Sequence, residues 1–333
     1  MIPARMSRLP PLCATLAALA VTAGPSSAQA PPPPVPPPPA PGKASLAVSG
    51  GVATKRMRYF ARRQRVLVTG TVKPFADGQT VRLDVVGKKG KVIARRRTAV
   101  TRDARGGGRY AMRFRTRGAG FLRLVVKHAA TTQQRAFRAP ARRIQVVAWR
   151  AGAGSSGTRV LLLQRLLRSL GFATPVSGHF DAGTARAVTV FRKTNGLGRS
   201  GFAATSVYDR VLKHRGAFRL RHPRAGRRHV EFDWSRQVLV LARNGKPWRA
   251  YHASSGKPST PTVFGSFRFY RKQPGTNSHG MVHSNYFIGG YAIHGYASVP
   301  NYPASHGCIR VPISNAGEIY RNVSLGERIF VYR

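Results

Sequence analysis

The sequence contains one cysteine whose neighbours favour catalysis. Cys308 stands in the segment SHGCIR, residues 305–310, and His294 lies upstream in an Ile-His-Gly turn. A thiolate is a strong nucleophile, and a nearby imidazole either removes the thiol proton or stabilises the thiolate. These residue types therefore indicate covalent catalysis by a cysteine.

Residues beside the cysteine could stabilise charge during such a reaction. The cationic side chain of Arg310, the ring of His306 and ordered backbone N–H groups around Gly307 would all favour the thiolate. Because glycine has no side chain, a substrate carbonyl can approach the backbone at Gly307 closely, and N–H groups there could form an oxyanion hole. We therefore expect this segment to provide both the nucleophile and part of the transition-state binding site.

Carboxylates are missing from this part of the sequence. No acidic residue lies between Asp233 and Glu318, so a Cys-His-Asp triad cannot be built from nearby residues. If His294 is the base, a neutral acceptor must hold its second ring nitrogen. The candidates are a backbone carbonyl and the side chains of Asn285 and Asn301.

The histidine turn and the cysteine segment together resemble the signature of the L,D-transpeptidases, also called the YkuD family. Upstream segments are similar to the opening strands of that domain: HVEFDWSRQVLVL, NGK, SSG and TPTVFGSF at residues 229–241, 244–246, 254–256 and 260–267. The resemblance covers residues 228–333. It implies a mainly-β catalytic domain without a cofactor.

The resemblance implies a role for each matching residue. Cys308 matches the family's nucleophile, His294 matches its general base, and Gly295 matches the residue whose carbonyl orients the imidazole. Other residues expected at the site shape the oxyanion region or contact substrate: Ser305, His306, Gly307, Arg310 and, as an apolar wall, Tyr286.

The reaction implied by the resemblance is a transfer between two peptidoglycan stem tetrapeptides, one donor and one acceptor. Cys308 would attack the bond between the diamino acid at position three and D-alanine at position four, forming a thioester. The amine of the acceptor would then make a 3-to-3 cross-link, a step of cell-wall biogenesis that affects cell shape. Two alternatives stay open: water as acceptor would make the protein an L,D-carboxypeptidase, and a degenerate domain would make it a non-catalytic wall-binding protein.

A zinc site is the alternative reading of the histidines. His279, His283, His294 and His306 supply enough imidazoles for zinc. A zinc peptidase usually needs a nearby glutamate as base, and this part of the sequence has none. We therefore expect no metal, and we expect the loop that carries His279 and His283 to cover the thiol site.

The charge of the chain restricts its partners. Of 333 residues, 57 are Lys or Arg and nine are Asp or Glu, which gives a formal net charge of +48. Such a balance favours polyanions, and nucleic acid is the usual one. Residues 1–30 argue against nucleic acid, because arginines at 5 and 8, an apolar run at 12–23 and small residues at 26–30 are typical of a secretory signal peptide.

Export would bring the protein to the cell wall or the periplasm. We therefore expect a secreted protein whose polyanionic partners are cell-wall polymers. The apolar run is too short for a membrane span, so none is expected after cleavage, with an uncleaved anchor as the alternative. Cys13 leaves with the signal peptide, so the mature chain would carry one thiol and no disulfide.

Composition divides the rest of the chain into domains and linkers. Residues 31–43 form a Pro-rich linker, which is expected to be extended. Residues 44–148 contain seven short alternating runs, which predict an all-β immunoglobulin-like sandwich. Residues 149–156 form a Gly/Ser linker.

Residues 157–214 predict a small helical domain. Apolar residues recur every three or four positions over 160–170 and 184–191, which indicates two amphipathic helices. Gly171 suits a helix C-terminus and Asp181 suits a helix N-cap. The segment resembles a peptidoglycan-binding domain of the three-helix type, so its loss should cost wall binding more than turnover of a small stem peptide.

Overall fold

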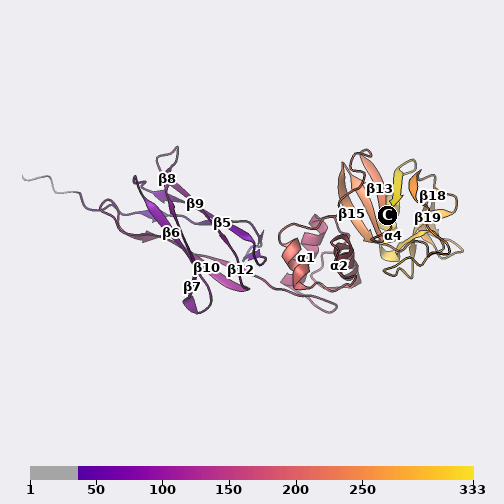
Figure 1. Ribbon diagram of the computed structural model, residues 1–333, viewed down its shortest axis with the longest axis horizontal. Helices are drawn as coiled ribbons and strands as arrows, with labels where there is room; N and C mark the ends of the chain where they lie inside the picture. The colour runs from indigo at the N-terminus through magenta and orange to yellow at the C-terminus, as the bar shows by residue number, and fades with distance from the viewer. Residues whose placement is uncertain (1–36) are drawn as a thin grey trace, which may run out of the picture. The chain divides into compact units, whose positions relative to one another are not determined.

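The computed structural model describes residues 37–333, and within that range the predicted multidomain fold class is confirmed (Figure 1). A β-rich N-terminal region, a group of three helices and a C-terminal β-rich region follow one another along the chain. The expected signal peptide, residues 1–30, and the first part of the Pro-rich linker lie outside the described residues. No helix within residues 37–333 is long and apolar enough to cross a membrane.

Alternation of apolar and basic residues shapes the N-terminal β-domain. Strand β9 (Gly108–Arg115) buries Tyr110, Met112 and Phe114 and exposes the residues between them. Because side chains alternate across a strand, one face of β9 packs into the core while the other stays basic. The core therefore lies between two sheets, and the outer faces carry the arginines.

The two sheets of this domain have simple strand orders. One has the order β1-β5-β9-β8 with β2 paired to β5, and the other has the order β3-β4-β12-β10-β6-β7 with β11 paired to β10. The elements are β1 (Lys43–Ala44), β2 (Ala47–Ser49), β3 (Val52–Ala53), β4 (Arg58–Phe60), β5 (Arg65–Lys73), β6 (Thr80–Val86), a 3-10 helix (Lys88–Gly90), β7 (Val92–Ala99), β8 (Thr101–Arg102), β10 (Gly120–His128), β11 (Phe137–Arg138) and β12 (Arg142–Val146).

The helical module contains α1 (Thr158–Ser169), α2 (Ala182–Thr194) and α3 (Thr205–Val211). Both predicted caps are present: Asp181 accepts a hydrogen bond from Thr184 N at 2.7 Å, and Gly171 follows α1 with a φ of +87°. The first satisfies a free N–H of α2, and the second uses a conformation that favours glycine.

The C-terminal domain has two sheets and one helix. The first sheet has the order β15-β14-β13-β21-β16, and the second has the order β17-β18-β19-β20. Helix α4 (Ile313–Asn322) packs on β18 and β19. The strands are β13 (Arg228–Asp233), β14 (Val238–Arg243), β15 (Lys246–His252), β16 (Gly265–Arg268), β17 (Arg271–Thr276), β18 (Val282–Ile288), β19 (Tyr291–Tyr296), β20 (Ile309–Pro312) and β21 (Arg328–Tyr332).

The helical module and the C-terminal domain share a hydrophobic core. Phe172 and Phe191 of the module belong to the same buried cluster as Val238, Val240 and Ala250 of β14 and β15. A backbone hydrogen bond joins the same surfaces, because Ala250 N donates to Gly171 O at 2.7 Å. The module is therefore part of the packing of the first C-terminal sheet.

Candidate active site

Two neighbouring parallel strands bring the predicted catalytic residues together. Strands β19 and β20 pair so that Ile293 lies opposite Ile309 and His294 lies opposite Arg310. Both isoleucines are fully buried, which fixes the strands in the core and places the next residues at its margin. Cys308 directly precedes β20.

These residues open into one cavity of about 340 Å³. Its lining combines the cysteine segment, the histidine turn and one loop: His279, Met281, His294, Tyr296, Ser305, His306, Cys308 and Arg310. Five of the predicted site residues therefore share a space that a substrate group can enter.

The imidazole of His294 is held by a backbone carbonyl. Its Nδ1 lies 2.9 Å from Gly295 O, and the side chain is only 3% exposed. Because a carbonyl can only accept, Nδ1 carries the proton and Nε2 keeps its lone pair. Burial lowers the pKa of His294, the Gly295 carbonyl opposes that shift, and the charge of Arg310 adds to it. The ring is therefore neutral at neutral pH and able to accept a proton.

The thiol of Cys308 is uncharged in the resting site. Burial raises its pKa above the ordinary value, while a backbone hydrogen bond from Ala292 and the charge of Arg310 oppose the rise. Its Sγ donates to Gly290 O at 3.6 Å. A neutral thiol that shares a cavity with a neutral imidazole can be activated by transfer of its proton to the ring, which is general-base activation.

The cysteine segment is braced from within by Ser305. Its Oγ donates to Cys308 O at 2.6 Å and accepts from Gly307 N at 3.1 Å. The N–H of Gly307 is therefore already used. Among residues 37–333, no backbone or side-chain acceptor bonds the N–H of Cys308, so this group is the free donor beside the sulfur.

A second hydroxyl braces the segment from outside. Thr262 is 1% exposed, and its Oγ1 donates to Gly307 O at 2.6 Å and accepts from Gly256 N at 2.8 Å. A Cβ on Gly256 would lie 2.9 Å from Gly307 Cα, so the two glycines pack backbone against backbone. This contact helps to hold the cysteine segment in position.

Gly307 is required by its conformation as well as by its surroundings. Its φ is +121°, and a Cβ there would lie 2.5 Å from the ring of Tyr291. Sequence reasoning predicted close approach of a substrate carbonyl here, and packing against the Tyr291 ring is a further reason for a glycine.

Arg310 forms one wall of the cavity. Its guanidinium carbon lies 4.1 Å from the centre of the Tyr296 ring, and its Nη1 donates to Ala304 O at 3.4 Å. The stacking holds a permanent positive charge beside the thiol and the imidazole. Arg310 therefore influences both ionisable groups.

Of three further residues predicted near the thiol, one lines the cavity and two do not. His279 lines it. Tyr286 does not: it lies in β18, donates its OH to Gln273 Oε1 at 2.9 Å, and carries Arg271 over its ring at 3.9 Å. His283 also points elsewhere, because its Nδ1 accepts from Gly275 N at 3.2 Å. Only part of the expected covering loop therefore reaches the thiol.

The four histidines do not converge. Within residues 37–333, no group of three or more His, Cys, Asp or Glu side chains is arranged to hold a metal ion. His279, His294 and His306 border one cavity, but His283 is bonded in its own hairpin.

Sequence reasoning missed two lining residues and a supporting network. Tyr296 stands two residues after His294 on β19, so strand periodicity could have placed both on one face. Met281 gave no signal. Buried Gln237 holds Ser255 through both side-chain atoms, at 2.7 and 2.9 Å, and Ser255 O accepts from Ser305 N at 2.9 Å.

Family models match two parts of the chain. The L,D-transpeptidase catalytic domain model (YkuD) matches residues 227–331, and a peptidoglycan binding domain model matches residues 156–209. The cavity and both of its strands lie inside the first range. No curated protein sequence is significantly similar to the chain.

Solved structures of L,D-transpeptidases are similar to the chain. The enzyme from Xylanimonas cellulosilytica DSM 15894 is 30% identical, with a TM-score of 0.52, over 98% of its chain and 56% of this one. An L,D-transpeptidase from Stackebrandtia nassauensis is 18% identical, with a TM-score of 0.34, over 95% of its chain and 55% of this one. One from Mycobacterium tuberculosis H37Rv is 19% identical, with a TM-score of 0.30, over 58% of its chain and 32% of this one.

Proposed function

Since the chain belongs to the YkuD family of L,D-transpeptidases, we propose that it is a cysteine acyltransferase that cross-links peptidoglycan stem peptides. One observation carries the proposal: a neutral imidazole, held by Gly295 O at 2.9 Å, lines the same cavity as Cys308. This arrangement provides a base whose free nitrogen can take the thiol proton. The catalytic residues are Cys308, His294 and Gly295.

The first half of the reaction transfers the donor peptide to the enzyme. Nε2 of His294 takes the proton of Cys308, and the sulfur attacks the carbonyl carbon of the position-three diamino acid. The N–H of Cys308 stabilises the oxyanion, with His306 and Arg310 at the rim of the cavity. D-alanine then leaves with the proton from His294, and a thioester remains.

The second half releases the peptide to an acceptor. The side-chain amine of a second stem attacks the thioester carbonyl and gives a proton to His294. The carbon–sulfur bond breaks, Cys308 regains its proton, and a 3-to-3 cross-link forms. Water in place of the amine would give the carboxypeptidase product.

The remaining domains are proposed to bring this site to its substrate. The chain contains a match to a peptidoglycan binding domain, which would raise the local concentration of stem peptides without changing the chemical step. We place the protein outside the cytoplasm, secreted through residues 1–30 and retained at the cell wall by peptidoglycan and anionic polymers. The mechanism uses no metal or cofactor.

The direct test is mass spectrometry of the products formed from a disaccharide tetrapeptide. The wild-type chain is expected to release D-alanine and to form a dimeric muropeptide linked between two position-three residues. A mass increase of the protein under short incubation would identify the thioester. The Cys308→Ala variant should show neither product nor adduct.

The alternatives give other results. D-alanine release without dimer would assign the carboxypeptidase reaction. Equal behaviour of the wild type and of Cys308→Ala, with no product in either, would overturn the enzyme proposal.

A further inference from the structure

One side of the N-terminal β-domain is left open between two sheet edges. Strand β7 is the last strand of its sheet and pairs only with β6. Strand β8 covers only the first two residues of β9, since its pairs are Thr101 with Arg109 and Arg102 with Gly108. The rest of β9 and the whole of β7 therefore have free edges, and these two strands lie near each other.

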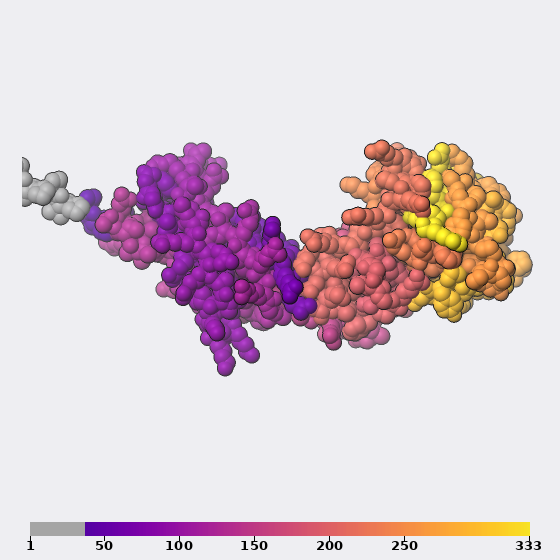
Figure 2. Space-filling model, in the orientation of Figure 1, coloured from indigo at the N-terminus to yellow at the C-terminus, as the bar shows by residue number. Residues whose placement is uncertain are grey.

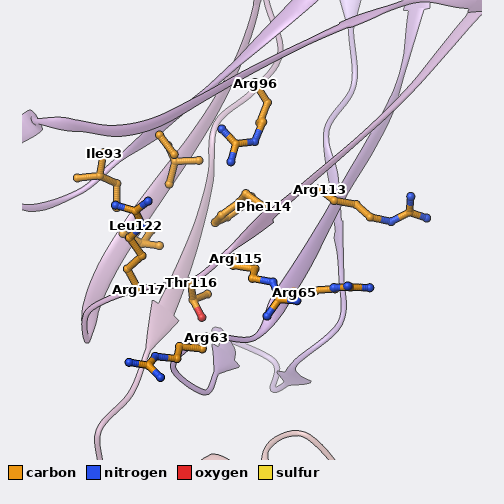
Figure 3. A pocket seen from close by; sticks show the side chains of 12 residues that line it. Arg63, Arg65, Ile93, Arg96, Arg113, Phe114, Arg115, Thr116, Arg117 and Leu122 are labelled. Carbon is orange, nitrogen blue, oxygen red and sulfur yellow. The ribbon is translucent and has the colours of Figure 1, made fainter.

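A groove of about 730 Å³ occupies this opening, and we call it the arginine groove. Its floor includes Phe114, Leu122 and Ile93, of which Ile93 is 41% exposed. Six arginines and no acidic residue line it: Arg63, Arg65, Arg96, Arg113, Arg115 and Arg117. Figure 3 shows Arg63, Arg96 and Arg117 around the apolar side chains, whereas Arg65 and Arg113 point away from them.

The charges of these arginines are not neutralised by the protein. All six side chains are exposed, and no acidic side chain within residues 37–333 forms an ion pair with any of them. Arg65 even lies directly opposite Arg115 in the β5–β9 pairing. Like charges at opposite positions destabilise a sheet, so an anion in or beside the groove would relieve this repulsion.

The arginines could serve either to protect the free strand edges or to bind a ligand, and the two roles need different surroundings. Charged side chains on free edges prevent strand pairing with other chains, and that role needs neither a groove nor an apolar floor. The arginine groove has a groove and an apolar floor as well as the charges, so a ligand site explains more of its features. A ligand that matches this combination has anionic groups for the guanidinium forks and an apolar face for the exposed part of the floor, chiefly Ile93.

We propose that the arginine groove binds an acidic polysaccharide whose sugar units carry carboxylates. The ring faces of such a polymer pack on the apolar floor, and its carboxylates pair with the arginines. Arg63, Arg96 and Arg117 surround this floor (Figure 3), so carboxylates on different sugar units of the polymer can each meet a guanidinium group.

The groove is less suited to single-stranded nucleic acid. Such ligands need exposed aromatic rings on which bases stack. The only aromatic residue that lines the groove, Phe114, is 4% exposed. The proposal uses the proposed cell-wall location only to choose a polysaccharide, and it does not depend on the catalytic residues.

The test measures binding of oligogalacturonate to the full chain by calorimetry at two salt concentrations. A groove variant with Arg63→Gln, Arg96→Gln and Arg117→Gln should bind about tenfold more weakly. A control variant removes three other exposed arginines of the same domain, which have no ion pair: Arg56→Gln, Arg105→Gln and Arg109→Gln. The control should lose less than about threefold, because it keeps the groove and has the same net charge.

A neutral substitution separates the groove from general electrostatics. Ile93→Ala changes no charge but removes part of the floor, so it should weaken oligogalacturonate binding severalfold at high salt, where Coulomb attraction is screened. Ile288→Ala, at a similarly exposed isoleucine of β18 (37%), should have no effect.

Three outcomes would overturn the proposal: equal losses in the groove and control variants, equal binding of an uncharged oligosaccharide, or tighter groove-dependent binding of an oligodeoxythymidylate. Release of D-alanine from a small tetrapeptide is measured in parallel. It should be unchanged in every variant, so failure of the groove proposal is distinguishable from failure of the catalytic one.

Discussion

Lys193 Nζ lies 3.0 Å from His252 Nδ1, in the interface between helix α2 and strand β15. Nε2 of the same ring lies 2.8 Å from Val299 O. Because that carbonyl accepts the Nε2 proton, Nδ1 is the acceptor and the lysine donates. Lys193 also donates to Gln237 O at 3.1 Å. A buried amine of the helical module thus hydrogen-bonds two parts of the catalytic domain.

The first prediction concerns stability and pH. Burial, with a smaller contribution from Arg199, lowers the pKa of Lys193 to about 7 from 10.5. Between these values the unfolded chain binds a proton that the folded chain does not, so stability rises with pH through this window. The Lys193→Met variant should lose this rise, which amounts to about 3–5 kcal/mol, and should be the more stable protein near pH 6.5.

The measurement is thermal unfolding at pH 6.5 and 9.5. The exposed Lys246 provides the control, because Lys246→Met should change the melting temperature equally at both values. An identical pH dependence in the wild type and in Lys193→Met would show that the amine stays charged in the folded state.

The second prediction concerns removal of the helical module. Since Val238, Val240 and Ala250 pack against the module, a fragment of residues 228–333 exposes part of its core. We expect its melting temperature to fall by at least about 5 °C relative to a fragment of residues 149–333, and its turnover of a small tetrapeptide to fall as well. The sequence alone predicted that loss of the module costs wall binding more than turnover of a small stem peptide, and equal turnover by both fragments would support that expectation.

The catalytic segment was predictable because its chemistry is local. A thiol, a histidine and a glycine directly before one strand predict the nucleophile, and a second histidine lies on the neighbouring strand. The missing acids predicted a neutral acceptor for His294 but left a backbone carbonyl and two asparagines open, and the acceptor in the structure is Gly295 O. The position of Tyr286 outside the cavity was not predictable from local sequence, because it depends on how β17 pairs with β18. Lys193 stands in the last turn of an amphipathic helix, where cations are common, and only packing against β15 makes it buried.

The third prediction isolates the hydroxyl of Thr262. Thr262→Val keeps the shape but leaves Gly307 O and Gly256 N without a partner, at a cost of about 1–3 kcal/mol in stability. Displacement of the cysteine segment should reduce thioester formation about tenfold to a hundredfold. Thr262→Ser retains the hydroxyl and should recover most of the rate. Equal rates for the valine and serine variants would assign Thr262 to packing alone.

The fourth prediction concerns Gly307. An alanine there combines a φ of +121° with a Cβ only 2.5 Å from the Tyr291 ring, so the segment must shift. Acylation should fall by about a hundredfold, and alkylation of Cys308 by iodoacetamide should change with it. The control is Gly290→Ala, beside the thiol at a position whose Cβ would meet no atom within 4 Å. Comparable losses in both variants would mean that any added methyl group near the sulfur is harmful.

The fifth prediction concerns the pH dependence of acylation. The rate needs a neutral His294, and burial, aided by Arg310, lowers the pKa of this imidazole below 6.5. As pH falls the ring protonates and the base is lost, so the acid limb of the rate should have its midpoint below pH 6.5. In Arg310→Gln one cause of the lowered pKa is removed, and the midpoint should move to higher pH. Single-turnover release of D-alanine from pH 4.5 to 8.5 measures this, with the exposed Arg271→Gln as control. A midpoint that shifts equally in both variants, or not at all in Arg310→Gln, would show that the acid limb does not report the imidazole beside Arg310.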